Sequence, residues 1–252
     1  MKSKWADEFY KMQYGSMSAI DASYYETQAD EIMEQIGKPI DSLLELGSWD
    51  GSLACVISEN VSRMTTVELV KEMAEAAQKN NPGNIDSVHG SFYDVQITDK
   101  FDAVIYIDGF GTGTDADQLK LLKNIKHWMD VDGCALIDIY QPEHWKKADG
   151  IEMRPDPLNN HDIIRRYSYD YERNIMMDTW WQADKKEPGQ TQYLRCYTPE
   201  EIDEMCRQTG LKVTAYFPNG AMDYVSMSYH ENASLEECMS YRFKIMKQPE
   251  TI

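Results

Sequence analysis

Apolar and polar positions alternate along the first 140 residues in two rhythms, which indicate strands and helices in turn. Short apolar runs predict five strands: Ile40 to Leu46, Met64 to Leu69, Ile85 to His89, Phe101 to Ile107 and Cys134 to Tyr140. Helical spacing separates several of these runs, over Gly51 to Glu59, Val70 to Lys79 and Ala116 to Met129. This alternation predicts right-handed crossovers and a parallel sheet buried on both faces.

The pattern changes on either side of this core. An aromatic-rich helical segment, Trp5 to Gln35, precedes the first strand and is expected either to pack on the sheet or to cover a ligand. Beyond Tyr140, Thr198 and Glu201 form a capping-box pattern that starts a helix, and Gly210 ends it. Later strands are predicted over Asp162 to Tyr171, Ile175 to Gln182, Gln190 to Tyr197, Leu211 to Phe217 and Tyr241 to Lys247; the first two form a hairpin.

Length and charge narrow the function classes. The 252 residues fit one large α/β domain. The net charge of −18 would on average repel phosphates, so nucleic acid is disfavoured, although Arg165, Arg166 and Arg173 leave a local basic groove open. The five cysteines form no Cys-x-x-Cys pair, and no apolar run has the length of a signal peptide or a membrane span. We therefore expect a soluble, cytoplasmic protein with reduced thiols.

A glycine turn, Gly47 to Gly51, follows the first predicted strand and opens a helix, which places backbone N–H groups near a ligand. Its spacing is Gly-x-x-x-Gly and not the Gly-x-Gly-x-x-Gly of dinucleotide sites. Glu45 and Asp50 flank the turn and oppose a diphosphate, whereas they complement a cation such as S-adenosylmethionine (SAM). Glu68, at the end of the second strand, suits the two hydroxyls of a ribose.

Several motifs from about Tyr24 to Lys247 resemble those of the class I SAM-dependent methyltransferases. These are Glu45 to Gly51, Val67 to Met73, His89 to Phe92, Tyr106 to Gly111 and Val131 to Leu136. The resemblance implies a doubly wound, mostly parallel, seven-stranded Rossmann-like sheet with an antiparallel last strand and an antiparallel β insert before the sixth strand. It also implies one domain over residues 1–252, with an N-terminal helical lid at about 1–36 and a substrate-covering insert at about 141–197.

The same resemblance assigns the residues that hold SAM. Tyr10, Tyr14 and Tyr24 would close over its methionine end. The full set of expected cofactor-binding residues is Tyr14, Tyr24, Glu45, Gly47, Ser48, Trp49, Gly51, Glu68, Leu69, Met73, Ser91, Phe92, Asp108 and Gly109. Two positions depart from the family pattern. Trp49 replaces a glycine, so its indole either points away or forms a wall of the pocket, and Ser91 stands where many relatives have an aspartate for the adenine amino group.

Acceptor-side candidates follow the fourth and fifth strands, because ligands lie at the carboxyl ends of parallel strands. His144 is the candidate general base, since imidazole titrates near neutral pH, and its alternative is a loop histidine bonded to the backbone. Asp108 either orients an amine or the SAM ammonium, or only forms a turn before Gly109. The expected substrate-binding residues are Tyr140, His144, Trp145 and Arg165, with His161 and Arg166 as further candidates on the hairpin.

The leading hypothesis is therefore transfer of a methyl group from SAM to a small-molecule O or N acceptor, with S-adenosylhomocysteine as the product. No Asn-Pro-Pro-Tyr or Asp-Pro-Pro-Tyr motif follows the fourth strand, and no metal site is expected. The alternatives are a non-catalytic SAM-binding module, a nucleic-acid or protein methyltransferase, and a nicotinamide dehydrogenase. The expected partner is a small molecule, with neither nucleic acid nor membrane, and the chain is expected to be a monomer or a homodimer.

Overall fold

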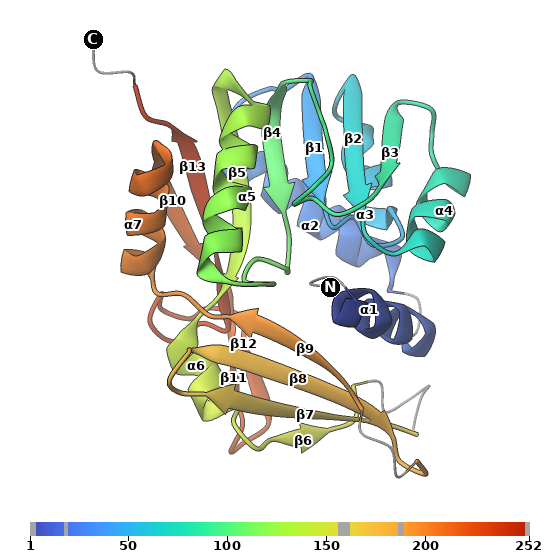
Figure 1. The fold of residues 1–252 in the computed structure, drawn as a ribbon, viewed down its shortest axis with the longest axis vertical. Helices are drawn as coiled ribbons and strands as arrows, with labels where there is room; N and C mark the ends of the chain where they lie inside the picture. Colours follow the sequence, from blue (N-terminus) through green and yellow to red (C-terminus); the bar gives the residue numbers. More distant parts are fainter. Residues whose placement is uncertain (1–3, 18–19, 156–161, 186–188, 250–252) are drawn as a thin grey trace.

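The computed structural model describes residues 4–17, 20–155, 162–185 and 189–249, and Figure 1 shows their arrangement. The helices are α1 (Lys4–Ser16), α2 (Ala22–Ile36), α3 (Ser52–Ser58), α4 (Lys71–Lys79), α5 (Asp115–Trp128), α6 (Pro142–Lys147) and α7 (Pro199–Thr209). The strands are β1 (Ser42–Leu46), β2 (Arg63–Glu68), β3 (Ile85–His89), β4 (Phe101–Tyr106), β5 (Met129–Tyr140), β6 (Glu152–Met153), β7 (Ile163–Asp170), β8 (Ile175–Gln182), β9 (Gln190–Arg195), β10 (Leu211–Pro218), β11 (Ala221–Asp223), β12 (Ser228–His230) and β13 (Ser240–Lys247).

A seven-stranded sheet forms the centre of the molecule, in the order β10-β13-β5-β4-β1-β2-β3. The β3, β2, β1, β4 and β5 strands pair in parallel, whereas β13 pairs antiparallel with both β5 and β10. The chain inserts an antiparallel sheet before β10, the sixth strand of the central sheet. This arrangement confirms the expected fold class.

Helices cover both faces of the central sheet because successive strand residues point to opposite sides. Leu43 packs in one hydrophobic cluster with α2 and α3. Its neighbour Leu44 belongs to a second hydrophobic cluster, which contains the buried side chains of α5 and α7. The β1 strand is buried along its whole length, as expected for a strand covered on both faces. Burial of this kind fixes where each strand ends and so positions the loops that follow.

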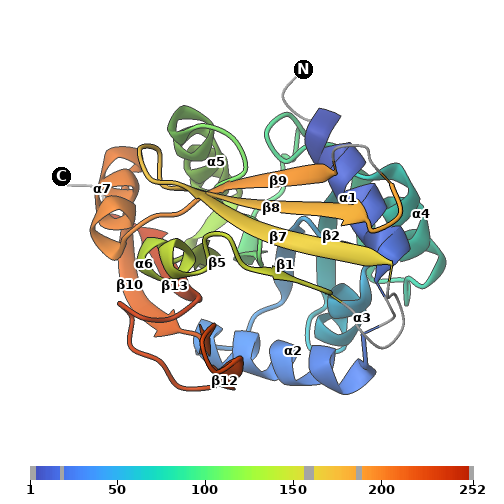
Figure 2. The same cartoon turned by 90° about the horizontal axis from the view of Figure 1, so that it is seen from below.

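The β6-β7-β8-β9 sheet, here called the insert sheet, lies with α1 below the carboxyl ends of the parallel strands (Figure 1). Seen from below, β7, β8 and β9 cross the strand ends, and α1 runs beside β9 (Figure 2). Phe9 of α1 packs on Trp180 of β8, and the Tyr10 hydroxyl accepts a hydrogen bond from Gln192 Nε2 of β9 at 2.9 Å. The α1 helix and the insert sheet therefore form one layer.

Several elements differ from the sequence-based expectation. The N-terminal segment is two helices and not one, because Asp21 caps a new helix by accepting a hydrogen bond from Ser23 N. The β5 strand starts at Met129, five residues early, and its pairing with β4 shifts register across the predicted turn. The pattern did not predict β6, β11 or β12, which are two or three residues long. Such short strands carry too few residues for an alternation signal.

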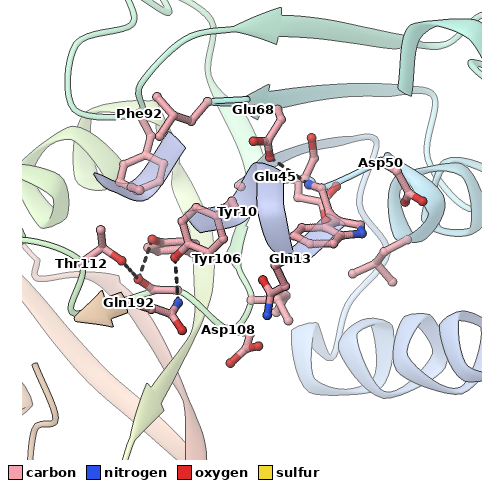
Figure 3. Close-up of a pocket in the computed structure, with 18 of the residues that line it drawn as sticks. Tyr10, Gln13, Glu45, Asp50, Glu68, Phe92, Tyr106, Asp108, Thr112 and Gln192 are labelled. Atoms are coloured by element: carbon pink, nitrogen blue, oxygen red, sulfur yellow. Dashed lines mark hydrogen bonds between the residues drawn. The ribbon is translucent and has the colours of Figure 1, made fainter. Parts of the chain in front are cut away.

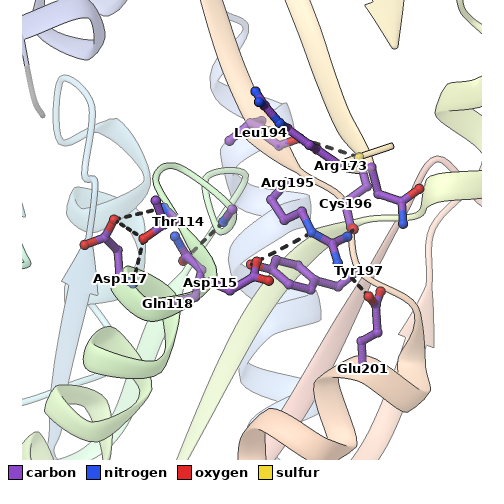
Figure 4. Close-up of polar contacts among 12 residues, drawn as sticks. Thr114, Asp115, Asp117, Gln118, Arg173, Leu194, Arg195, Cys196, Tyr197 and Glu201 are labelled. Carbon is purple, nitrogen blue, oxygen red and sulfur yellow. Dashed lines mark hydrogen bonds and ion pairs between the residues drawn. The ribbon is translucent and has the colours of Figure 1, made fainter. Parts of the chain in front are cut away.

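A polar cluster joins the insert sheet to the core at the end of β9 (Figure 4). Arg195 bonds Glu201 of α7 at 2.6 Å, and its Nε lies 3.5 Å from Asp115 of α5. The Tyr197 hydroxyl donates to the same Asp115 at 2.8 Å. Because Thr198 and Glu201 form the predicted capping box of α7, these contacts tie β9 to the starts of two core helices. The insert sheet is thereby held over the strand ends.

Candidate functional site

A cavity of about 770 Å³ lies between the carboxyl ends of β1, β2, β4 and β5 and the layer of α1 and the insert sheet (Figure 3). Its volume is in the range of small-molecule and cofactor sites. The residues expected to bind SAM that line it are Tyr24, Glu45, Gly47, Ser48, Trp49, Glu68, Leu69, Ser91, Phe92, Asp108 and Gly109. Two of the expected substrate-binding residues, Tyr140 and Arg165, also line it. The cavity is thus lined by members of both the expected SAM-binding set and the expected substrate-binding set.

The glycine turn forms one wall of this cavity. Gly47 has a φ of 71° and its N–H donates to Val67 O at 2.8 Å, so the turn is tied to β2. Gly51 has a φ of 81° and does not line the cavity. A Cβ on Gly51 would lie 2.8 Å from the Ala77 Cβ, so this glycine allows α4 to approach the turn. Gly51 therefore shapes the site through packing and not through ligand contact.

Glu68 connects the two strand ends. Its Oε1 accepts a hydrogen bond from Val70 N at 2.8 Å, and its Oε2 accepts one from Trp49 N at 3.0 Å. Burial raises the pKa of Glu68 to about 7, although these backbone hydrogen bonds lower it. Each carboxylate oxygen can accept a second hydrogen bond, so Glu68 can hold the turn and still accept from a ligand hydroxyl.

Glu45 is the most unusual carboxyl group of the cavity. Its Oε2 and the nearby Ser48 Oγ are buried and have no hydrogen-bond partner within the described residues. Burial, with the neighbouring charges of Glu68 and Asp50, raises the pKa of Glu45 to about 8. A buried polar atom without a partner is costly unless a ligand satisfies it. These two atoms therefore fit a bound group that donates hydrogen bonds or carries positive charge.

The raised pKa of Glu45 predicts a pH-dependent stability. Between about pH 4.5 and 8, the folded ligand-free protein holds a proton on Glu45 that the unfolded chain releases, so the free energy of unfolding falls as pH rises. We expect Glu45→Gln to flatten the dependence of Tm on pH between 5 and 8.5 and to raise Tm at the alkaline end, measured by calorimetry.

Glu59→Gln is the matched control for this experiment, because Glu59 is exposed at the end of α3. Its curve should follow that of the unsubstituted protein. Some slope should persist in Glu45→Gln, because burial also raises the pKa values of Glu68 and Asp108. Parallel curves for Glu45→Gln and the unsubstituted protein would contradict the assignment.

Trp49, in place of the usual glycine, keeps the backbone conformation that a glycine would adopt. Its φ is 52°, which is uncommon for a bulky residue. Its side chain lines the cavity and packs edge-on against Tyr14 of α1, with ring centroids 5.5 Å apart. Of the two expectations, the indole therefore forms a wall. Tyr14 itself does not line the cavity within the described residues, and it covers Trp49 from outside.

The far side of the glycine turn is aromatic. Phe92 lines the cavity, and its ring centroid lies 5.0 Å from that of Tyr106. Leu69, just after β2, also lines the cavity. Ser91 also lines the cavity, and its Oγ accepts from Tyr93 N at 3.3 Å. Met73, by contrast, is fully buried in α4 and does not line the cavity, which corrects its expected role. It packs inside the protein because α4 presents it to the core.

Asp108 and Tyr140 form the acceptor side. Asp108 has a φ of 56°, and its Oδ1 accepts a hydrogen bond of 2.5 Å from the Tyr140 hydroxyl. Its side chain is exposed, and the cavity lies against it. Because protein surrounds this part of the cavity, burial raises the pKa of Asp108 to about 6, against the hydrogen bond from Tyr140, which lowers it. Asp108 is therefore more than a turn residue.

His144 and Trp145 do not line the cavity, which corrects their expected roles. Gln141 caps α6, and the side chains of both residues contact backbone oxygens just before β13. His144 is buried, with Nδ1 3.2 Å from Glu237 O and Nε2 3.3 Å from the Tyr224 hydroxyl. Trp145 stacks on Tyr140 with ring centroids 4.9 Å apart. His144 is thus the backbone-bonded histidine of the alternative interpretation.

Arg165 reaches the cavity from β7 but is already paired. It makes two hydrogen bonds to the buried Asp178, at 2.9 and 2.8 Å, and its guanidinium lies over the Tyr167 and Trp180 rings. Arg166 points to the other face of the strand and bonds Glu152. His161 lies outside the described residues. Arg165 and Arg166 therefore both bind carboxylates of the insert sheet itself.

Sequence reasoning missed some cavity residues. The α1 helix presents Ala6, Tyr10 and Gln13 to the cavity, at the three- and four-residue spacing of one helix face, and Met17 lines the cavity just after the helix ends. Tyr10 was expected there, but Gln13 was not. Thr112 and Gln192 were also missed. The helical spacing could have identified Gln13 once Tyr10 was assigned, whereas no signal marks Gln192 on a strand far away in sequence.

In the described ranges, no group of three or more His, Cys, Asp or Glu side chains could hold a metal ion. No described helix is long and apolar enough to cross a membrane. All five cysteines are free thiols.

Comparisons with known proteins agree with this geometry. Residues 43–133 match the family model described as a methyltransferase domain. No curated protein matches the sequence. A SAM-dependent methyltransferase from Clostridium acetobutylicum aligns with a TM-score of 0.70 at 13% identity, covering 91% of this chain and 93% of that one.

Two further solved structures are an amino pentose methyltransferase and a glycopeptide N-methyltransferase. The SAM-bound amino pentose methyltransferase CalS10 from Micromonospora echinaspora aligns with a TM-score of 0.64 at 18% identity, covering 94% of this chain and 96% of that one. The glycopeptide N-methyltransferase MtfA in complex with sinefungin aligns with a TM-score of 0.60 at 18% identity, covering 92% of this chain and 88% of that one. At such identities the alignments establish the fold. The family match assigns a methyltransferase domain to residues 43–133, and the chain has the class I methyltransferase fold of these solved structures.

Proposed function

We propose that this protein binds SAM in the cavity and transfers its methyl group to a small-molecule O or N acceptor, with S-adenosylhomocysteine as the product. SAM supplies a methyl group on a positively charged sulfur. The observation that carries the proposal is the unpartnered, buried carboxyl oxygen of Glu45 beside the glycine turn, one strand away from Glu68. A cationic adenosine derivative fits this pair of carboxyl groups, whereas a diphosphate does not.

The chain's own residues divide between two ends of the cavity. Glu45 and Ser48 would hold the methionine part of SAM, Glu68 the ribose, and Leu69 and Phe92 the adenine. The α1 helix would cover them, as part of a lid over residues 1–36. Asp108 and Tyr140 would face the acceptor, under an insert at about 141–197. Methyl transfer gains its rate largely from positioning, so these walls would supply most of the catalysis.

A non-catalytic SAM-binding module is the main alternative. The cavity extends past the glycine turn to Asp108, Tyr140 and Arg165, which leaves space for a second molecule and favours an enzyme. The aligned structures include an amino pentose methyltransferase and a glycopeptide N-methyltransferase, which supports a small-molecule acceptor. The net charge of −18 disfavours nucleic acid.

The test is a titration of the purified protein with S-adenosylhomocysteine by calorimetry, followed by incubation of metabolite extracts with isotopically labelled SAM. We expect saturable binding and a labelled small-molecule product identified by mass. Binding without any labelled product would favour the binding module. Absence of binding would overturn the proposal.

A further inference from the structure

The charges that line the cavity are strongly unequal. The described lining residues include six acids, Glu45, Asp50, Glu68, Asp94, Asp108 and Asp117, and two cations, Lys120 and Arg165. Both cations already have carboxylate partners: Lys120 lies 3.3 Å from Asp94, and Arg165 binds Asp178 through two hydrogen bonds. Lys120 therefore offsets only Asp94, Arg165 is already bound to Asp178, and no basic residue of the described lining forms an ion pair with Asp108.

Asp108 is the carboxylate of the acceptor end. It follows β4, whereas Glu45 and Glu68 belong to β1 and β2 at the other end of the predicted SAM site. The Tyr140 hydroxyl fixes its Oδ1, and Tyr140 is in turn held by stacking on Trp145, whose Nε1 donates to Met239 O at 2.8 Å. The carboxylate is thus held in one orientation while its side chain remains exposed.

We propose that the methyl acceptor is a small-molecule amine, which enters as an ammonium ion and is held by the Asp108 carboxylate. This inference rests on the proposed function. An anionic acceptor, such as a carboxylate or a phosphate ester, would meet the same charge and be repelled. A neutral alcohol would gain less from Asp108, because it can donate a hydrogen bond to the carboxylate but brings no opposite charge to be attracted by it.

The reaction balances with Asp108 as the proton acceptor. The bound ammonium gives one proton to the carboxylate, and the nitrogen lone pair then forms the bond to the methyl carbon. The bond from that carbon to sulfur breaks, and its electron pair stays on sulfur. The product leaves as a methylated ammonium ion, and Asp108 passes its proton to water. The raised pKa of Asp108 suits a group that takes up and releases a proton near neutral pH.

Three probes of matched shape test the inference: benzylamine, benzyl alcohol and benzoate. Each is titrated at pH 7.5 into the full chain saturated with S-adenosylhomocysteine. We expect benzylamine to bind at least about tenfold more tightly than benzyl alcohol, and benzoate to bind most weakly. This ranking is measured on the unsubstituted protein, so it holds even if a variant fails to fold.

Asp108→Asn should remove the preference for benzylamine while leaving the affinity for S-adenosylhomocysteine unchanged, since asparagine tolerates the positive φ. Asp132→Asn, at an exposed position near the opposite end of β5, makes the same charge change and should keep the preference.

Three results would overturn the inference. The first is equal or tighter binding of benzyl alcohol or benzoate. The second is a preference that survives Asp108→Asn. The third is a loss of S-adenosylhomocysteine affinity in Asp108→Asn, which would assign Asp108 to the cofactor. If S-adenosylhomocysteine does not bind the unsubstituted protein, the proposed function fails, and the amine inference fails with it.

Discussion

Replacing Glu68 with glutamine is expected to weaken binding of S-adenosylhomocysteine by about 10- to 100-fold, as measured by calorimetry. The change would remove the proposed charge-assisted hydrogen bond to a ribose hydroxyl, a type of bond that is worth about 1.5–3 kcal/mol. It also places an amide NH₂ near Val70 N or Trp49 N, both of which now donate to the carboxylate. The second effect loosens the turn that carries Trp49, so both effects lower the affinity.

The matched control is Glu75→Gln, in the α4 helix that follows β2. Glu75 is exposed and pairs with Lys71 at 3.6 Å, an interaction that contributes little at a surface. It makes the same change in net charge, and the affinity should stay within twofold. An unchanged affinity in Glu68→Gln, with normal thermal unfolding, would remove Glu68 from the cofactor site.

Gly111→Ala is expected to lower the free energy of unfolding by about 2–4 kcal/mol and Tm by roughly 5–15 °C. Gly111 lies in the β4–α5 loop with a φ of 105°, and its O accepts a hydrogen bond of 3.0 Å from Arg195 N. A Cβ there would lie 2.3 Å from Arg195 O. Arg195 O is a backbone atom of β9 and cannot rotate away as a side chain could, so the insert sheet would have to move away from the core. Thermal unfolding measures the loss.

Gly83→Ala separates the two causes. Gly83 has a φ of 102°, close to that of Gly111, but a Cβ at this position would meet nothing within 4 Å. It therefore carries the backbone strain without the contact and should cost about 1 kcal/mol. The difference between the two variants is the cost of displacing β9. An equal decrease in the free energy of unfolding in both variants would mean that the close approach of Arg195 O to Gly111 does not contribute to the cost.

Much of the fold could be predicted because its signals are local. The alternation of apolar strands and amphipathic helices identified β1 to β4, and the capping residues of α7 marked its start and end. Short elements escaped prediction, since a two-residue strand such as β6 is stabilised by pairing with β7 and not by its own sequence. The early start of β5 also depends on a partner, β4, across an irregular register.

The site was predictable where one turn or one strand end determines the position. Glu45, Gly47 and Glu68 lie where the motif predicted because β1 and β2 are neighbours in a parallel sheet. His144 was misplaced for a physical reason: the sequence shows that it follows β5, but its ring lies against Glu237 O and the Tyr224 hydroxyl, which are distant in sequence. Gln192 could not be predicted, since its position depends on how the insert sheet folds back over the core.

The position of β13 in the sheet affects how the protein is made. This strand fills the gap between β5 and β10, yet it follows both in the chain. In a nascent chain that has emerged only to about residue 239, β13 is missing, so the edges of β5 and β10 that it would pair with are both unpaired. Unpaired edges of this kind recruit strands from other chains. We expect ribosome-bound intermediates of this length to be the species that most needs a chaperone.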